Sequence, residues 1–161
     1  NQVYQSQMKL YLNILVCFLA VFPIINSIAQ ENPLIGDWKV IAVDNGEFYF
    51  NSERDSISLS EELKSKYNDS SRVEQLKKMA KMIYIDMTFT FSSDGQFLQK
   101  NQIQPLNSFY KIDPKSCRIW IYESGLKQDS PDFSITYLLQ DNRLFMEIPV
   151  TEPPTKFELI R

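Results

Sequence analysis

The sequence of 161 residues contains no histidine, only four glycines and two cysteines. Histidine is the usual general base for serine and cysteine nucleophiles and the commonest zinc ligand, so its absence disfavours both kinds of site. Four glycines, each near a turn or a chain entry, cannot build a glycine-rich phosphate loop. The sequence therefore favours a protein without cofactor or metal. An enzyme is the less favoured alternative, because no carboxylate pair or calcium-type loop stands out.

The net charge disfavours two classes of partner, and the cysteine content excludes an internal disulfide. The net charge is −3 and no basic run occurs, which argues against nucleic acid and anionic membrane surfaces as partners. Cys117 is alone once the N-terminal segment with Cys17 is set aside, so the domain has no internal disulfide. We expect Cys117 to lie inside a strand as a small packed side chain. A thiol activated by Arg118 is the alternative.

The first 29 residues have the layout of a secretory signal peptide. Lys9 precedes the apolar run 10–25, and the small residues Ser27 and Ala29 follow it. We place the cleavage after Ala29, which leaves residues 30–161 as one domain. The sequence thus predicts an exported protein that is periplasmic, held in the cell envelope or secreted.

Two other interpretations of this segment are weaker. A membrane anchor is disfavoured because the run is short, Pro23 interrupts it and no basic cluster follows, so no stable span is expected after processing. A lipoprotein would need a cysteine at the cleavage point, whereas Cys17 lies inside the apolar run. Met8 is the natural start, which makes residues 1–7 an upstream extension.

Most of the remaining chain shows alternating apolar and polar residues, the pattern of half-buried strands. Turn signals at 44–46, 94–95 and 141–142 separate consecutive strands. Such a meander has exposed edges unless it closes. The sequence predicts a mainly β fold, an antiparallel up-and-down barrel of about eight strands. The strands are expected at 36–43, 85–91, 96–103, 108–112, 118–123, 133–139, 144–148 and 156–160.

Residues 51–83 have helical rather than alternating spacing and form an insertion after the first strand. Ser58 or Ser60 can cap a first helix, and a second begins near Ser70 or Ser71. Such helices could cover an open end of the barrel. The second helix is expected to bury Val73, Leu76, Met79, Ala80 and Ile83 and to expose Lys77, Lys78 and Lys81 as a solvated surface rather than an anion site.

Aromatic side chains are frequent on the predicted inner faces. Either they fill the interior, or some line an apolar pocket, since ligand cavities are usually built from apolar and aromatic walls. The candidate ligand-binding residues are Phe89, Phe91, Phe97, Tyr110, Phe133 and Tyr137, with Phe157 as a further inward aromatic.

Four features together resemble the lipocalin-like domains of exported bacterial proteins, within the lipocalin and calycin superfamily. They are Gly36-Asp37-Trp38 at the entry to the first strand, the hairpin at 91–97, Tyr-Lys-Ile-Asp at 110–113 and a last strand that ends in Arg161. The resemblance implies that Gly36 and Trp38 close the barrel base, with Arg161 packed across the indole. The helical insertion at about 55–83 departs from the lipocalin pattern.

The leading functional hypothesis is a non-catalytic extracytoplasmic protein that binds a small hydrophobic or amphipathic ligand inside the barrel. The alternative is an envelope interaction or structural domain with a filled core. In that case the partner would be an envelope protein that meets an outer surface. The surface would be the helix at 77–81, the loop at 124–132, or Trp120 and Tyr122 if they face outward.

Overall fold

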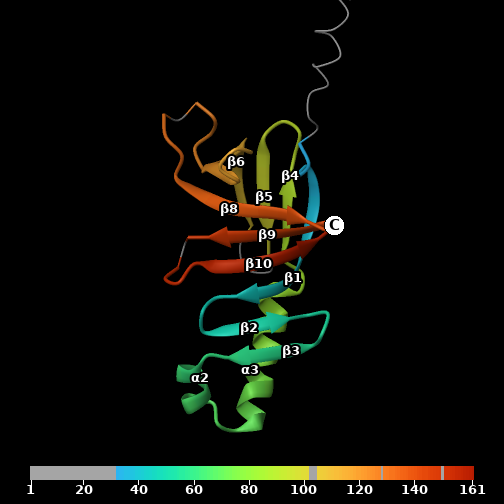
Figure 1. Cartoon of the computed structure of the whole chain (residues 1–161), viewed down its shortest axis with the longest axis vertical. Coiled ribbons are helices and arrows are strands. Elements are labelled where there is room, and N and C mark those ends of the chain that lie inside the picture. Colours follow the sequence, from blue (N-terminus) through green and yellow to red (C-terminus); the bar gives the residue numbers. More distant parts are fainter. Residues whose placement is uncertain (1–31, 102–104, 128, 150) are drawn as a thin grey trace, which may run out of the picture. The chain divides into compact units, whose positions relative to one another are not determined.

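A computed structural model describes residues 32–101, 105–127, 129–149 and 151–161 (Figure 1). The predicted signal peptide and its upstream extension lie outside these residues. Leu34–Arg161 form one compact unit. Its strands are β1 (Gly36–Asp44), β2 (Phe48–Asn51), β3 (Ser56–Leu59), β4 (Thr88–Phe91), β5 (Gln96–Lys100), β6 (Leu106–Asp113), β7 (Arg118–Tyr122), β8 (Phe133–Gln140), β9 (Arg143–Ile148) and β10 (Thr155–Ile160). Helices α2 (Glu61–Lys66) and α3 (Ser70–Tyr84) lie between β3 and β4.

Eight of these strands form a closed antiparallel barrel. The strands from β4 to β10 pair in chain order, β4 pairs with β1, and β1 pairs with β10 to close the circle. The closing pairs run from Lys39 and Ile160 to Asp44 and Lys156. The predicted mainly β fold, an up-and-down barrel with a helical insertion, is confirmed.

A β-bulge in β1 lets this strand serve two partners along one edge. Gly36–Lys39 pair with β4, whereas Ala42–Asp44 pair with β2. The register against β10 shifts between Val40 and Ala42. Before this shift the even-numbered residues Trp38 and Val40 point into the core, and after it the odd-numbered Val43 does. Because a bulge bends its strand and adds one residue, β1 keeps apolar side chains inside while it passes from the barrel to the β2–β3 hairpin. This hairpin was not resolved by the sequence pattern.

The connections define two ends of the barrel. The base carries the short β4–β5, β6–β7 and β8–β9 turns together with Gly36 and Arg161. In the β8–β9 turn Asp141 and Asn142 both have positive φ, as a two-residue type I′ hairpin requires. In the β4–β5 turn Gly95 has positive φ and Asp94 does not, because that loop is longer. The mouth is the opposite end, where the α3–β4, β5–β6, β7–β8 and β9–β10 connections lie.

Helix α3 differs from its predicted form in two respects. It continues to Tyr84, and β4 begins only at Thr88, because Tyr84 continues the stripe of Leu76, Lys77 and Ala80. Met79 is 53% exposed and does not belong to the packed face. The prediction that lysines 77 and 81 form a purely solvated surface is wrong.

The two lysines instead bind a carboxylate in the β2–β3 turn. Lys77 Nζ lies 3.3 Å and Lys81 Nζ 3.0 Å from the Asp55 carboxylate. The hydrogen bonds from Lys81 and then Lys77, with the positive charges of both lysines, lower the pKa of Asp55 below its ordinary value of 3.8. Asp55 thereby joins α3 to the hairpin that extends β1.

At the base, the three residues expected to close the barrel come together. Trp38 is buried, and its Nε1–H donates to the Leu34 carbonyl oxygen at 2.8 Å. The Arg161 guanidinium lies 4.8 Å from the indole centroid and donates to the Ile35 carbonyl oxygen at 3.1 Å. Gly36 has a φ of +128°, and a Cβ there would lie 3.9 Å from Arg161 Nε. Trp38 therefore sits under a charged cover at the start of β1.

We expect Trp38→Ala to lower the free energy of unfolding by roughly 3–5 kcal/mol, because it leaves a large cavity under Arg161. The matched control is Trp120→Ala on the outer face of β7, where the side chain is half-buried. Its expected cost is about 1 kcal/mol or less. Urea melts measure both values, and a Trp38→Ala midpoint equal to the wild-type midpoint would contradict the assigned role.

We expect Asp55→Asn to lower stability at neutral pH, with a difference from the wild type that shrinks in acid. A carboxyl whose folded pKa is depressed contributes stability above its unfolded pKa and loses it as the pH falls through the folded value. Urea midpoints of both proteins between pH 7 and pH 2 would measure this. Asp129→Asn, at an exposed loop carboxylate, is the control that should show no such convergence.

Candidate functional site

The barrel interior is hollow near the mouth. A cavity of about 380 Å³ lies among the ends of β5 to β10 and the end of α3. Most of its lining is apolar, and five lining residues carry polar groups. The lining residues are Ile83, Tyr84, Met87, Phe97, Gln99, Leu106, Glu123, Phe133, Ile135, Ile148, Thr151, Thr155 and Phe157.

Tyr84, the last residue of α3, forms one wall. Its ring meets Phe48 of β2 at 6.4 Å and Phe157 of β10 at 6.3 Å between centroids, both edge to face. Burial raises the pKa of the Tyr84 hydroxyl. Because helix geometry and not strand alternation directs this ring, the insertion supplies part of the cavity wall.

Below the cavity, towards the base, aromatic rings fill the interior. Phe89 contacts Phe97 at 5.9 Å and Phe157 at 5.5 Å between centroids. Phe91 contacts Phe97 at 5.2 Å and Tyr110 at 5.1 Å. Each such pair adds about 0.5–1.5 kcal/mol beyond area burial. The barrel is thus packed in its base half and open in its mouth half.

The six predicted ligand-binding residues are therefore divided among three places. Phe97 and Phe133 line the mouth cavity. Phe89, Phe91 and Tyr110 belong to the packed rings and line neither of the two cavities described here. Tyr137 packs against the core from the inward face of β8 and is also among the lining residues of a separate, smaller depression over β8–β10.

Sequence reasoning missed several lining residues, and only some of them carried a usable signal. Ile135 and Ile148 lie on the inward faces of β8 and β9, so alternation identifies them. Ile83 was assigned to the buried face of the helix, and Tyr84 was placed beyond the helix end, so neither was expected in the cavity wall. Thr151 lies in the β9–β10 loop, where no periodic pattern exists.

The polar groups of the cavity gather towards its rim. Thr151 Oγ1 lies 2.7 Å from the Pro153 carbonyl oxygen and 3.0 Å from Thr155 Oγ1. This loop packs tightly on the β1–β2 turn, where a Cβ on Gly46 would lie 2.2 Å from Pro153 Cγ. The hydroxyl pair and the glycine contact therefore fix the β9–β10 side of the mouth.

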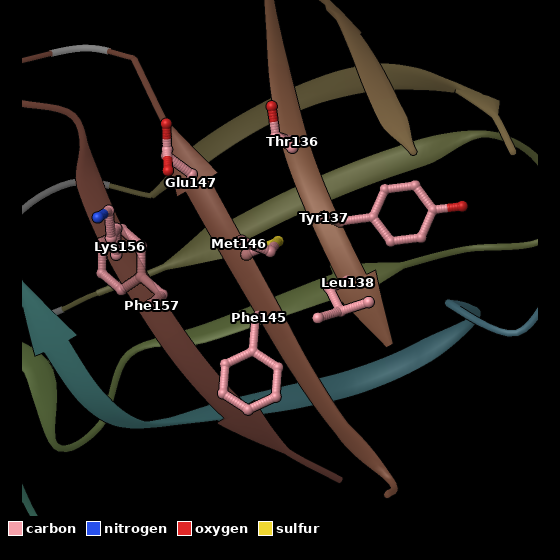
Figure 2. A pocket seen from close by; sticks show the side chains of 8 residues that line it. All are labelled: Thr136, Tyr137, Leu138, Phe145, Met146, Glu147, Lys156 and Phe157. Atoms are coloured by element: carbon pink, nitrogen blue, oxygen red, sulfur yellow. The ribbon is translucent and has the colours of Figure 1, made fainter. Parts of the chain in front are cut away.

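The outer depression has about 230 Å³ and lies over β8, β9 and β10 (Figure 2). Leu138 is 54% exposed and lies opposite Phe145 on the neighbouring strand. Burial is the main cause that raises the pKa of Tyr137, with the nearby Cys117 and Asp113 adding to it. Its residues are Thr136, Tyr137, Leu138, Phe145, Met146, Glu147, Lys156 and Phe157.

Tyr122, Trp120 and Cys117 differ from their expected surroundings. Tyr122 is only 8% exposed, with the Lys111 ammonium 5.0 Å from its ring, so it offers little free surface. Trp120 is half-buried under Arg118, whose guanidinium lies 5.7 Å from the indole. Cys117 is exposed in the β6–β7 turn with a φ of +52°, not packed inside a strand, because β7 begins at Arg118.

Neither a metal-binding cluster nor a membrane-spanning helix occurs among the described residues. Nowhere in these ranges do three or more Cys, Asp or Glu side chains gather in a way that could hold a metal ion. Over the same ranges, no helix combines the length and apolar character that crossing a membrane would require. The cavity offers apolar walls and a polar rim, which suit binding of an amphipathic molecule.

Comparisons with known proteins assign no family. No protein-family model matches the sequence, and no curated protein matches it. Among solved structures, the chain is similar to a DUF4847 family protein from Bacteroides vulgatus ATCC 8482. The identity is 16%, the match covers 81% of this chain and 95% of that chain, and the TM-score is 0.49.

Ser108 gives a test of the packing below the cavity. It is 1% exposed on β6, and its Oγ has no hydrogen-bond partner among the described residues. An unpaired buried hydroxyl costs about 1–3 kcal/mol. We expect Ser108→Ala to raise the free energy of unfolding by about 1 kcal/mol in urea melts.

Ser134→Ala is the control. It lies on β8, where the side chain is half-buried, and should change the free energy of unfolding by less than about 0.5 kcal/mol. Destabilisation by Ser108→Ala would show that the hydroxyl is satisfied.

Proposed function

We propose that this protein binds a small hydrophobic or amphipathic molecule in the mouth cavity and performs no chemistry on it. The observation that carries the proposal is the cavity of about 380 Å³ with mainly apolar walls. Ligand sites typically measure about 300–1,000 Å³ and combine apolar walls with few polar groups. The cavity is therefore at the small end of this range.

The packed base limits the size of the ligand. Phe89 and Phe91 occupy the interior below the cavity and pack on Phe97, which forms part of its wall, so a ligand would enter only the mouth half. A volume of 380 Å³ corresponds to on the order of twelve water-sized volumes. We therefore expect a single short chain or a small ring system rather than a long lipid.

The proposal includes a lipocalin-type role outside the cytoplasm. Two observations support it: the arrangement of Gly36, Trp38 and Arg161 at the base of a closed barrel, and the signal-like sequence at 1–29. An interaction domain that uses its outer face is the alternative. Its best surface is the smaller depression of about 230 Å³ over β8–β10.

Cavity-filling variants test the ligand site. We expect the uncharged fluorescent probe N-phenyl-1-naphthylamine to bind the wild type saturably, with about one site per chain. Leu106→Trp places a large ring at a half-buried wall position and should weaken binding at least tenfold. Leu138→Trp adds the same ring to the outer depression and should leave the dissociation constant unchanged.

Ile148→Phe is a second filling variant, in case Leu106→Trp alters folding. Circular dichroism and urea melts establish that each variant is folded before titration. Absence of saturable binding by the wild type would contradict the proposed function. Loss of binding in Leu138→Trp alone would move the site to the outer depression.

A further inference from the structure

The charged side chain among the described lining residues of the mouth cavity is negative. Glu123 is the only ionisable residue with a formal charge among its described lining residues, and no Lys or Arg is among them. The other polar lining groups are the Gln99 amide, the hydroxyls of Thr151 and Thr155, and the Tyr84 phenol, all of them neutral at pH 7. A ligand in this cavity would therefore meet a negative rim above apolar walls.

The chain fixes Glu123 at this place by strand geometry. Ile119 and Ile121 are fully buried on the inner face of β7, and Glu123 continues the same alternation beyond the strand end. Its backbone N–H donates to Asp132 Oδ2 at 2.7 Å, and the Asp132 N–H donates to the Ile121 carbonyl oxygen at 2.9 Å. These two hydrogen bonds join the two ends of the β7–β8 loop, so they fix the backbone position of Glu123.

The charge of Glu123 determines which head group suits this rim. An apolar cavity below this one carboxylate is the complement of an amphiphile with a positive head group. A fatty-acid anion would instead place its carboxylate next to Glu123, and like charges repel. The Gln99 amide oxygen can also accept a hydrogen bond from an ammonium group.

We propose that the mouth selects amphiphiles whose head group is a protonated amine, with Glu123 as the counter-charge. This inference rests on the proposed ligand function, because it assigns the head-group chemistry of the same cavity. Glu123 is exposed, so the pair resembles an exposed ion pair, which typically changes affinity by up to about fivefold.

The test uses three ligands with the same ten-carbon chain: decylamine, decanol and decanoate. Each displaces N-phenyl-1-naphthylamine from the wild-type protein at pH 7, below its micelle concentration. We expect decylamine to bind about three- to fivefold more tightly than decanol, and decanoate to bind more weakly than both. Salt at 1 M should reduce the difference between decylamine and decanol, because it screens exposed charges.

Glu123→Gln should remove the preference for decylamine and leave decanol binding unchanged. Glu147→Gln is the matched control: it makes the same charge change at an exposed site on the outer depression and should keep the preference. Equal binding of all three ligands, or an unchanged preference in Glu123→Gln, would overturn the head-group assignment and leave the cavity function standing. Failure of the probe and all three ligands to bind would overturn the proposed function itself.

Discussion

The pairing of β1 with β10 is the constraint on which the rest of the structure depends. It joins the first and last barrel strands, and without it both would be open edges of a curved sheet. Trp38 and Arg161 stand at its base end, where the indole is buried beneath the guanidinium. Because these two residues are 123 positions apart, closure also ties the chain ends of the domain together.

Closure alone does not decide whether the interior is full or hollow. An eight-stranded barrel is at the size where side chains can either fill the interior or leave room for one ligand. Here the two outcomes share one barrel. Phe89 and Phe91 pack ring to ring with Phe97 in the base half, whereas the walls of the mouth half include smaller residues such as Ile135 and Ile148. The hollow exists where β4 and β5 offer no further aromatic residue to fill it.

The insertion completes the mouth in a way that typical barrel strands do not. The bulge in β1 directs its second half to β2, and α3 returns along this extension to deliver Tyr84 to the cavity. Asp55 holds α3 to the hairpin through Lys77 and Lys81. A change in that ion cluster would therefore act on the cavity wall through the position of the helix end.

Alternating side chains and turn signals were sufficient to predict the eight barrel strands and their order, although the apolar run 40–43 of β1 does not alternate. The β2–β3 hairpin was missed, since Ser56–Leu59 is a short strand with no fully buried residue. The α3–β4 boundary was misplaced because Ile85 and Met87 extend the alternation of Phe89 and Phe91 backwards, beyond the start of β4 at Thr88. The cavity could not be predicted at all: it is the difference between the enclosed volume and the summed side-chain volumes, and no local pattern records that difference.

The same reasoning explains why charge is the most informative feature of the cavity. Apolar walls attract any molecule of suitable size, so they set affinity and discriminate weakly between chain-like ligands. In the proposed function, a single carboxylate at the rim, with no lining cation to neutralise it in the described residues, would separate ligands by the sign of their head group. Strand alternation places Glu123 there, beyond Ile121 on the inner face of β7. Closure of the sheet provides the barrel, and incomplete filling of its interior provides the cavity. In the proposed function, the position of the Glu123 side chain would set the head-group preference of that cavity.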